Sequence, residues 1–302
     1  MRISIWPNAN QPYDGVLDAA RHAETTGWDG VYVADHFMVL PSMAAMETPT
    51  LECATVVTAL AASVPRMRIG ALVFGNTYRH PAVLANMAAT IDHISGGRFV
   101  LGVGAGWQEN EHEQYGIDLP PPGERLDRFE EALEVIRGLL ERPRTTFAGR
   151  HYRLSDAVCE PKPVQRPLPI LIGGSGERRM LRIVAQRADI WNTWGRPDVI
   201  AHKSAVLERH CAEVGRDPAT ITRSAQALVL LGAEPDEVEA RAARSPLPVI
   251  GGSDDELVQT LGRYAEIGVS EFIVSDRTLG SGNERRDAMD RFIERIAGPH
   301  RA

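Results

Sequence analysis

Residues 67–103, MRIGALVFGNTYRHPAVLANMAATIDHISGGRFVLGV, alternate between two short apolar runs and one longer helical run. Met67–Leu72 and Arg98–Val103 are apolar along most of their length, which is typical of buried parallel strands. Between them, Pro81–Ile94 has the pattern of a helix that starts on a proline and stops at a pair of glycines. A strand, a helix and a second strand in this order predict one repeating unit of a parallel α/β fold.

The same alternation continues on both sides of this stretch and predicts a (β/α)8 TIM barrel in a single domain, residues 1–302. Thr145–Pro169 interrupts the alternation, because it is rich in proline and short extended pieces, and is expected to be an insertion before strand 5. The eight expected strands are Arg2–Trp6, Gly30–Val33, Met67–Leu72, Arg98–Val103, Ile170–Ile172, Ile190–Thr193, Thr222–Leu230 and Glu271–Val274.

The composition is ordinary for a soluble globular protein and does not argue against a small-molecule substrate. A formal charge of −7 argues against a general nucleic-acid binder, which needs a basic face to meet phosphates. No window approaches the roughly 20 apolar residues that cross a bilayer, and the N-terminus lacks the pattern of a signal peptide. Cys53, Cys159 and Cys211 are far apart and have no histidine cluster near them, so no metal site is expected. These features predict a cytoplasmic protein with no nucleic-acid or membrane partner.

A glycine-rich run lies at the end of the expected fifth strand, and in TIM barrels the chemistry is found where strands run into helices. Gly173-Gly174-Ser175-Gly176 directly precedes a helix expected at Arg178–Arg187. Glycines let backbone N–H groups approach an anion, and a helix N-terminus adds its positive dipole. The run therefore predicts a phosphate site, with Arg178 adding charge. A plain glycine-rich turn without a ligand is the alternative.

Asp35 and His36 stand where the expected second strand ends. A histidine there can donate a proton or bind a cofactor carbonyl, and the aspartate can set its tautomer or cap the loop. The alternative is a structural pair in which Asp35 makes a local turn. A metal site is not indicated, because the His-x-His pair of barrel metallohydrolases is missing.

Small and aromatic residues gather at the other strand ends. Alternating glycines after the fourth strand leave room for a ligand against the backbone, and tryptophans offer flat walls. Each tryptophan could be ordinary core, and Arg79 could simply anchor its loop, but several aromatics at one barrel mouth favour a flat heterocycle. The residues expected to line this pocket are Trp6, Asn76, Gly104, Gly106, Trp107 and Trp194.

Two long stretches resemble a known family. NTYRHPAVLANMAATIDHISGGRFVLGVGAGW, residues 76–107, is similar to the third-to-fourth-strand segment of luciferase-like flavin and deazaflavin oxidoreductases. PKPVQRPLPILIGGSGERRMLRIVAQRADIWN, residues 161–192, is similar to their fifth-to-sixth-strand segment. The order and spacing agree, and the likeness runs over almost the whole chain, weakest after about residue 232.

The resemblance implies roles for residues at matching positions. Asp35 and His36 match the pair that lines the cofactor ring in the deazaflavin-dependent members. Leu72-Val73 falls where those members often have a bulge with a non-prolyl cis peptide behind the ring. Residues 173–176 match the loop that holds the cofactor phosphate, and residues 145–169 match the insertion that often covers cofactor or substrate. The resemblance also implies a homodimer.

One position departs from the family pattern. Members that oxidise sugar phosphates have a glutamate just after the GxG of strand four, where this chain has Trp107. Sugar-phosphate oxidation is therefore disfavoured, and an apolar or aromatic substrate is favoured. Glu109 or Glu111 could take the place of that glutamate, although both could equally be solvated loop charges.

The function expected first is hydride transfer between reduced coenzyme F420, a deazaflavin, and an imine, carbonyl or activated alkene, with His36 supplying the proton. Asp35, Trp6, Asn76 and Trp107 would shape the pocket, with Glu109 near the substrate. The alternative is an FMN-dependent monooxygenase that receives reduced FMN from a separate flavin reductase. A second alternative is a non-redox barrel that binds a phosphorylated ligand.

Overall fold

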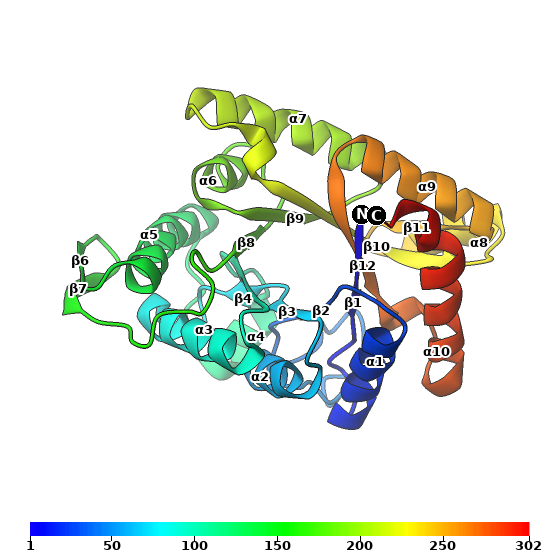
Figure 1. Cartoon of the computed structure of the whole chain (residues 1–302), viewed down its shortest axis with the longest axis horizontal. Helices are drawn as coiled ribbons and strands as arrows, with labels where there is room; N and C mark the ends of the chain where they lie inside the picture. Colours follow the sequence, from blue (N-terminus) through cyan, green and yellow to red (C-terminus); the bar gives the residue numbers. More distant parts are fainter. Residues whose placement is uncertain (302) are drawn as a thin grey trace. The chain divides into compact units, whose positions relative to one another are not determined.

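A computed structural model describes residues 1–301, which are organised by one ten-stranded sheet and a separate hairpin (Figure 1). The strand order is β11-β10-β12-β1-β2-β3-β5-β8-β9, and β9 pairs in turn with β10, so that eight strands close a ring. The pairs β1–β2, β1–β12, β10–β12, β9–β10, β3–β5 and β5–β8 are all parallel. This order confirms the predicted (β/α)8 class.

The strands are β1 (Arg2–Trp6), β2 (Gly30–Val33), β3 (Arg68–Ala71), β4 (Phe74–Gly75), β5 (Phe99–Gly104), β6 (Thr145–Ala148), β7 (Arg153–Ala157), β8 (Ile170–Gly173), β9 (Ile190–Trp194), β10 (Thr222–Leu231), β11 (Val249–Gly252) and β12 (Val269–Ser275). The α-helices are α1 (Tyr13–Thr25), α2 (Cys53–Ser63), α3 (Pro81–Ser95), α4 (Glu109–Tyr115), α5 (Pro122–Glu141), α6 (Met180–Arg187), α7 (Pro197–Glu213), α8 (Pro235–Arg244), α9 (Asp254–Glu266) and α10 (Gly282–Arg291).

The chain divides into two compact units. The first unit comprises residues 1–8, 13–32 and the chain from residue 173 onward, and the second comprises residues 9–12 and 33–172. In the first unit, α1 lies beside α10 (Figure 1). Its strands β1 and β12 run in register, so that Trp6 and Ser275 end them side by side. The single domain predicted for the whole chain stays a prediction.

The second unit places β5 close against β3. A Cβ atom on Gly102 of β5 would lie 1.9 Å from the carbonyl oxygen of Ala71 in β3, so only glycine fits there. Arg98, just before β5, donates hydrogen bonds of 2.8 Å to the carbonyl of Ala61 in α2 and 2.5 Å to that of Met67. These contacts fix the strand whose far end carries the predicted cofactor glycines.

Replacing Gly102 by alanine is expected to lower the free energy of unfolding by about 1–3 kcal/mol or more, because the new methyl group meets a backbone oxygen that cannot rotate away. Urea unfolding followed by circular dichroism measures this change. Gly123→Ala in α5 is the matched control, since a Cβ there meets no atom within 4 Å. Equal unfolding midpoints for Gly102→Ala and the wild type would show that β3 and β5 are not this close.

The structure differs from the expected elements in several places. The third strand expected at Met67–Leu72 is interrupted: β3 ends at Ala71, a cis peptide joins Leu72 to Val73, and the short β4 follows. The predicted insertion contains an antiparallel hairpin, β6–β7, and two cis prolines, Pro161 and Pro167. The helix α4 and the strand β11 were not predicted, because each is short and lacks a clear periodic pattern. Among residues 1–301, no helix is both long and apolar enough to cross a membrane.

Candidate active site

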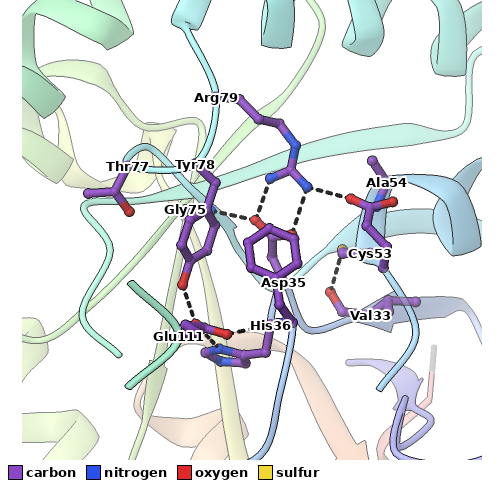
Figure 2. Close-up of polar contacts among 12 residues, drawn as sticks. Val33, Asp35, His36, Cys53, Ala54, Gly75, Thr77, Tyr78, Arg79 and Glu111 are labelled. Atoms are coloured by element: carbon purple, nitrogen blue, oxygen red, sulfur yellow. Dashed lines mark hydrogen bonds and ion pairs between the residues drawn. The ribbon is translucent and has the colours of Figure 1, made fainter. Parts of the chain in front are cut away.

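Asp35 follows β2 and forms a buried ion pair with Arg79 (Figure 2). Its Oδ2 accepts hydrogen bonds from Nη1 of Arg79 at 2.6 Å and from the backbone N–H of Gly75 at 2.8 Å, while Oδ1 accepts from Nη2 of Arg79 at 3.0 Å. The Nη2 group also donates to Glu52, which caps α2, at 2.5 Å. Asp35 therefore ties β4 and α2 to the end of β2.

Burial and the charge of the partner act in opposite directions on both residues of this pair. Burial raises the pKa of Asp35 above its usual range, while the Arg79 guanidinium and the Gly75 N–H oppose the rise. Burial alone would lower the pKa of Arg79, but the hydrogen bonds and charges of Asp35 and Glu52 raise it. Because Arg79 stays charged, it stabilises the Asp35 carboxylate, which would otherwise be buried without a charged partner. These contacts agree with the alternative in which Arg79 anchors its loop to the scaffold.

His36 is held by Glu111, a residue of α4 (Figure 2). Nδ1 of the imidazole lies 2.8 Å from Oε1 of Glu111, and the backbone N–H of Phe37 donates to Oε2 at 2.8 Å. The hydroxyl of Tyr78 also donates to Oε1. The His36 side chain is 29% exposed whereas that of Glu111 is fully buried, so the ring is anchored at one nitrogen and open elsewhere. Asp35 turns toward Arg79, so the contact that sets the tautomer of His36 comes from Glu111.

An aromatic side chain lies beside the partly exposed imidazole of His36. Trp107 lies edge-on to the imidazole, with ring centroids 5.5 Å apart, and remains 57% exposed. Glu109, in the first turn of α4, is exposed, unlike the buried Glu111 two residues later. The two glutamates that the sequence left as alternatives therefore have different environments, and only Glu111 contacts His36.

Close backbone packing surrounds this site. Gly106 has φ +83°, and a Cβ there would lie 2.4 Å from Oγ1 of Thr77. The backbone N–H of Asn76 donates to the carbonyl of Gly104 at 2.9 Å, and its side-chain amide donates to the hydroxyl of Tyr152 at 3.2 Å. The cis peptide at Leu72–Val73, which the resemblance implied, precedes this loop. The predicted residues of strands three and four thus share one neighbourhood in the second unit.

A cavity of about 250 Å³ adjoins Asn76. It is lined by arginines, a tyrosine hydroxyl and an asparagine amide, groups that suit an anionic part of a ligand. Arg125 donates to the carbonyl of Gly106 at 2.6 Å, while its buried Nε has no hydrogen-bond partner within residues 1–301. The lining residues are Asn76, Thr77, Tyr78, Arg79, His80, Asp118, Arg125, Arg128 and Tyr152.

The predicted phosphate run lies in the first unit. Gly173 ends β8, and Gly174 has φ +140° and donates its N–H to Asn192 at 3.1 Å. Ser175 and Gly176 are exposed, as is Arg178. The helix expected from Arg178 was placed too early, because residues 177–179 form a turn and α6 begins at Met180. The run leaves exposed backbone beside a helix start, which fits a phosphate group.

Glu177 anchors the end of this run to α7. Its Oε1 accepts from Nζ of Lys203 at 2.6 Å and lies 3.0 Å from Nε2 of His202. In the same unit, Trp6 and Trp194 meet edge to face with centroids 5.5 Å apart, and Arg277 lies over the Trp6 ring at 5.8 Å. The structure thus brings two of the three predicted tryptophans together.

The sequence offered Glu111 only as a possible replacement for a missing glutamate, and it did not assign Arg277 to the site. An acidic first turn and the glycine after Tyr115 could have predicted α4, but not that one of its glutamates would turn inward. No cluster of residues that could hold a metal ion occurs in the described part of the chain, residues 1–301.

A family model described as luciferase-like monooxygenase matches residues 1–297. The chain belongs to this family. The family resemblance predicted from residues 76–107 and 161–192 is therefore confirmed.

Individual relatives differ in activity. An uncharacterised protein of Mycobacterium tuberculosis, Rv0953c, is 28% identical over 293 residues, covering 92% of this chain and 91% of the relative. The pyrimidine monooxygenase RutA of Stutzerimonas stutzeri is 33% identical over 218 residues, 70% of this chain and 58% of RutA. The solved structure of an F420-dependent secondary alcohol dehydrogenase with an F420-acetone adduct superposes with a TM-score of 0.81 over 98% of both chains, at 21% identity. That structural likeness supports the barrel fold.

Proposed function

We propose that this family member transfers a hydride between reduced coenzyme F420 and a small imine, carbonyl or activated alkene. The observation that carries the proposal is the partly exposed imidazole of His36, fixed through Nδ1 by a buried carboxylate. Reduction of a polar double bond needs a proton for one atom when the other receives a hydride, and an anchored imidazole can supply it near neutral pH. Similarity to an F420-dependent alcohol dehydrogenase supports this choice.

Different residues of the chain would donate the proton, exclude water from the substrate and bind the cofactor. Bound F420 would supply the hydride. His36 would donate the proton from Nε2, and exposed Trp107 would exclude water from one side of the substrate. Asn76 and the glycines at 104 and 106 fit the edge of a flat ring, because they offer an amide and a close backbone. The exposed run at residues 173–176 would bind the phosphate through backbone N–H groups.

The second candidate is an FMN-dependent monooxygenase supplied by a flavin reductase. It is favoured by the similarity to the pyrimidine monooxygenase RutA, which covers 70% of this chain. The same ring and phosphate residues would serve either cofactor, so direct comparison of the two cofactors separates the candidates.

Tryptophan fluorescence is expected to be quenched saturably by oxidised F420 and much less by FMN. Titrating each cofactor into the purified protein measures this preference. Gly174→Asp is expected to weaken F420 binding at least about tenfold, because it adds a negative charge and a side chain at a glycine of φ +140°. Gly215→Asp, at a positive-φ glycine with no neighbour within 4 Å, controls for backbone strain. Preference for FMN would favour the monooxygenase, and quenching by neither would contradict both.

A further inference from the structure

Three hydrogen-bond donors, two from residues 36–37 and one from Tyr78, surround the carboxylate of Glu111. Its fully buried carboxylate accepts hydrogen bonds from Nδ1 of His36, the backbone N–H of Phe37 and the hydroxyl of Tyr78. Burial alone would raise the pKa of Glu111, but these three donors and the charge of His36 lower it. Glu111 is therefore an ionised acceptor, and an ionised acceptor binds N–H and O–H donors strongly.

This arrangement constrains His36 more tightly than a surface contact would. In a neutral imidazole one nitrogen carries the proton and the other accepts, and the partner of one nitrogen decides which. Since the Glu111 carboxylate can only accept, Nδ1 must carry the proton, and Nε2 is the nitrogen left to exchange one. Nε2 has no hydrogen-bond partner within residues 1–301.

Among residues 1–301, Glu111 is the carboxylate that hydrogen-bonds to His36. Asp35 is directed to Arg79, and Trp107 touches the imidazole only through an aromatic edge. The pKa of Tyr78 is raised by burial and by Glu111, so its hydroxyl remains a donor to Glu111. Tyr78 is itself packed against Phe37 and His112, with ring centroids 4.8 Å away in each case.

We propose that Glu111 is a positioning residue that holds His36 as the Nδ1–H tautomer and presents Nε2 for proton transfer. The proton-transfer part rests on the proposed function. In that step the Nε2–H bond of the imidazolium breaks and the proton goes to the substrate atom next to the one that receives the hydride. The Nδ1 proton stays on the imidazole, hydrogen-bonded to the Glu111 carboxylate, so His36 ends as the neutral Nδ1–H form. Tyr78 keeps the carboxylate in place.

The tautomer can be measured without cofactor or substrate. Protein labelled with ¹⁵N at histidine is titrated to a pH at which His36 is neutral, and the long-range ¹H–¹⁵N spectrum identifies the protonated nitrogen. A His36→Asn variant assigns the signal. The wild type is expected to show Nδ1 protonated. Glu111→Ala is expected to lose this preference, because no acceptor remains for Nδ1–H.

Matched variants show whether Glu111 positions His36 or only stabilises the fold. Glu113→Gln changes an exposed glutamate of the same helix and is expected to leave the His36 signal unchanged. If circular dichroism shows that Glu111→Ala is unfolded, Glu111→Gln takes its place. The glutamine amide has a single carbonyl oxygen to accept hydrogen bonds from the same three donors. The fraction of His36 in the Nδ1–H form is therefore expected to fall below that of the wild type. An Nε2–H tautomer in the wild type, or unchanged tautomers in the folded Glu111 variants, would overturn the proposal.

Kinetics then link the tautomer to the reaction. A Glu111 variant is expected to lower kcat by about 10²-fold, as misplacement of a reacting group does, with the Kd for F420 changed less than about threefold. An unchanged kcat would overturn the positioning role. If the Nδ1–H tautomer is found and F420 is not used at all, the proposed function fails while the assignment of Glu111 stands.

Discussion

Replacing His36 by asparagine is expected to lower kcat for F420-dependent reduction by about 10²–10⁴-fold, the usual contribution of a positioned general acid. The loss follows from the anchored imidazole, whose free nitrogen is the proton source in the proposed reaction. Stopped-flow oxidation of reduced F420 by substrate gives kcat directly.

Cofactor affinity separates this effect from a damaged pocket. The Kd for F420, from fluorescence quenching, is expected to stay within about threefold of the wild-type value in His36→Asn. His93, in the last turn of α3, is exposed and lies outside the residues proposed to bind the cofactor, so His93→Asn is the control. A kcat for His36→Asn within fivefold of the wild type would assign the proton to another donor.

Replacing Arg79 by methionine is expected to lower the free energy of unfolding by about 3–5 kcal/mol, because Asp35 would remain as a buried charge without its partner. The variant Asp35→Asn/Arg79→Met, which removes both charges, is expected to recover part of that loss. Urea unfolding of the two variants and the wild type measures both changes.

The decrease in the free energy of unfolding of Arg79→Met is also expected to depend on pH. Burial raises the pKa of Asp35 in the folded protein, so the carboxyl is protonated more readily there than in the unfolded chain, whose value is about 3.9. The destabilisation should therefore be small at low pH and grow as the pH rises through the folded-state pKa. A loss that is independent of pH between about 4 and 8 would contradict the assignment of Asp35 as the unpaired charge.

The sequence predicted the barrel because its strands and helices alternate with clear periods and end on glycines and prolines. It also predicted the neighbourhood of Asn76 and Trp107, because strand ends meet at one edge of a parallel sheet. It placed α6 two residues too early, because Arg178 and Arg179 are compatible with a helix but form a turn. The error in α6 is one of element boundary, where local sequence signals are weakest.

The Glu111–His36 contact could not be predicted from the sequence, since the two residues are 75 positions apart and the facing side of α4 depends on tertiary packing. Arg277 over Trp6 is a contact of the same kind, made across the first unit. The expected homodimer, which a single chain does not test, stays a prediction, as does the cytoplasmic location.

Anaerobic oxidation of reduced F420 by a panel of imines, carbonyls and activated alkenes, compared with oxygen consumption in the presence of reduced FMN, tests the central claim most directly. The proposed function predicts that F420 is oxidised without oxygen, in a substrate-dependent reaction that His36→Asn slows at least about 10²-fold. Substrate-dependent oxygen consumption with FMN, and no oxidation of F420 by any of the three substrate classes, would contradict it.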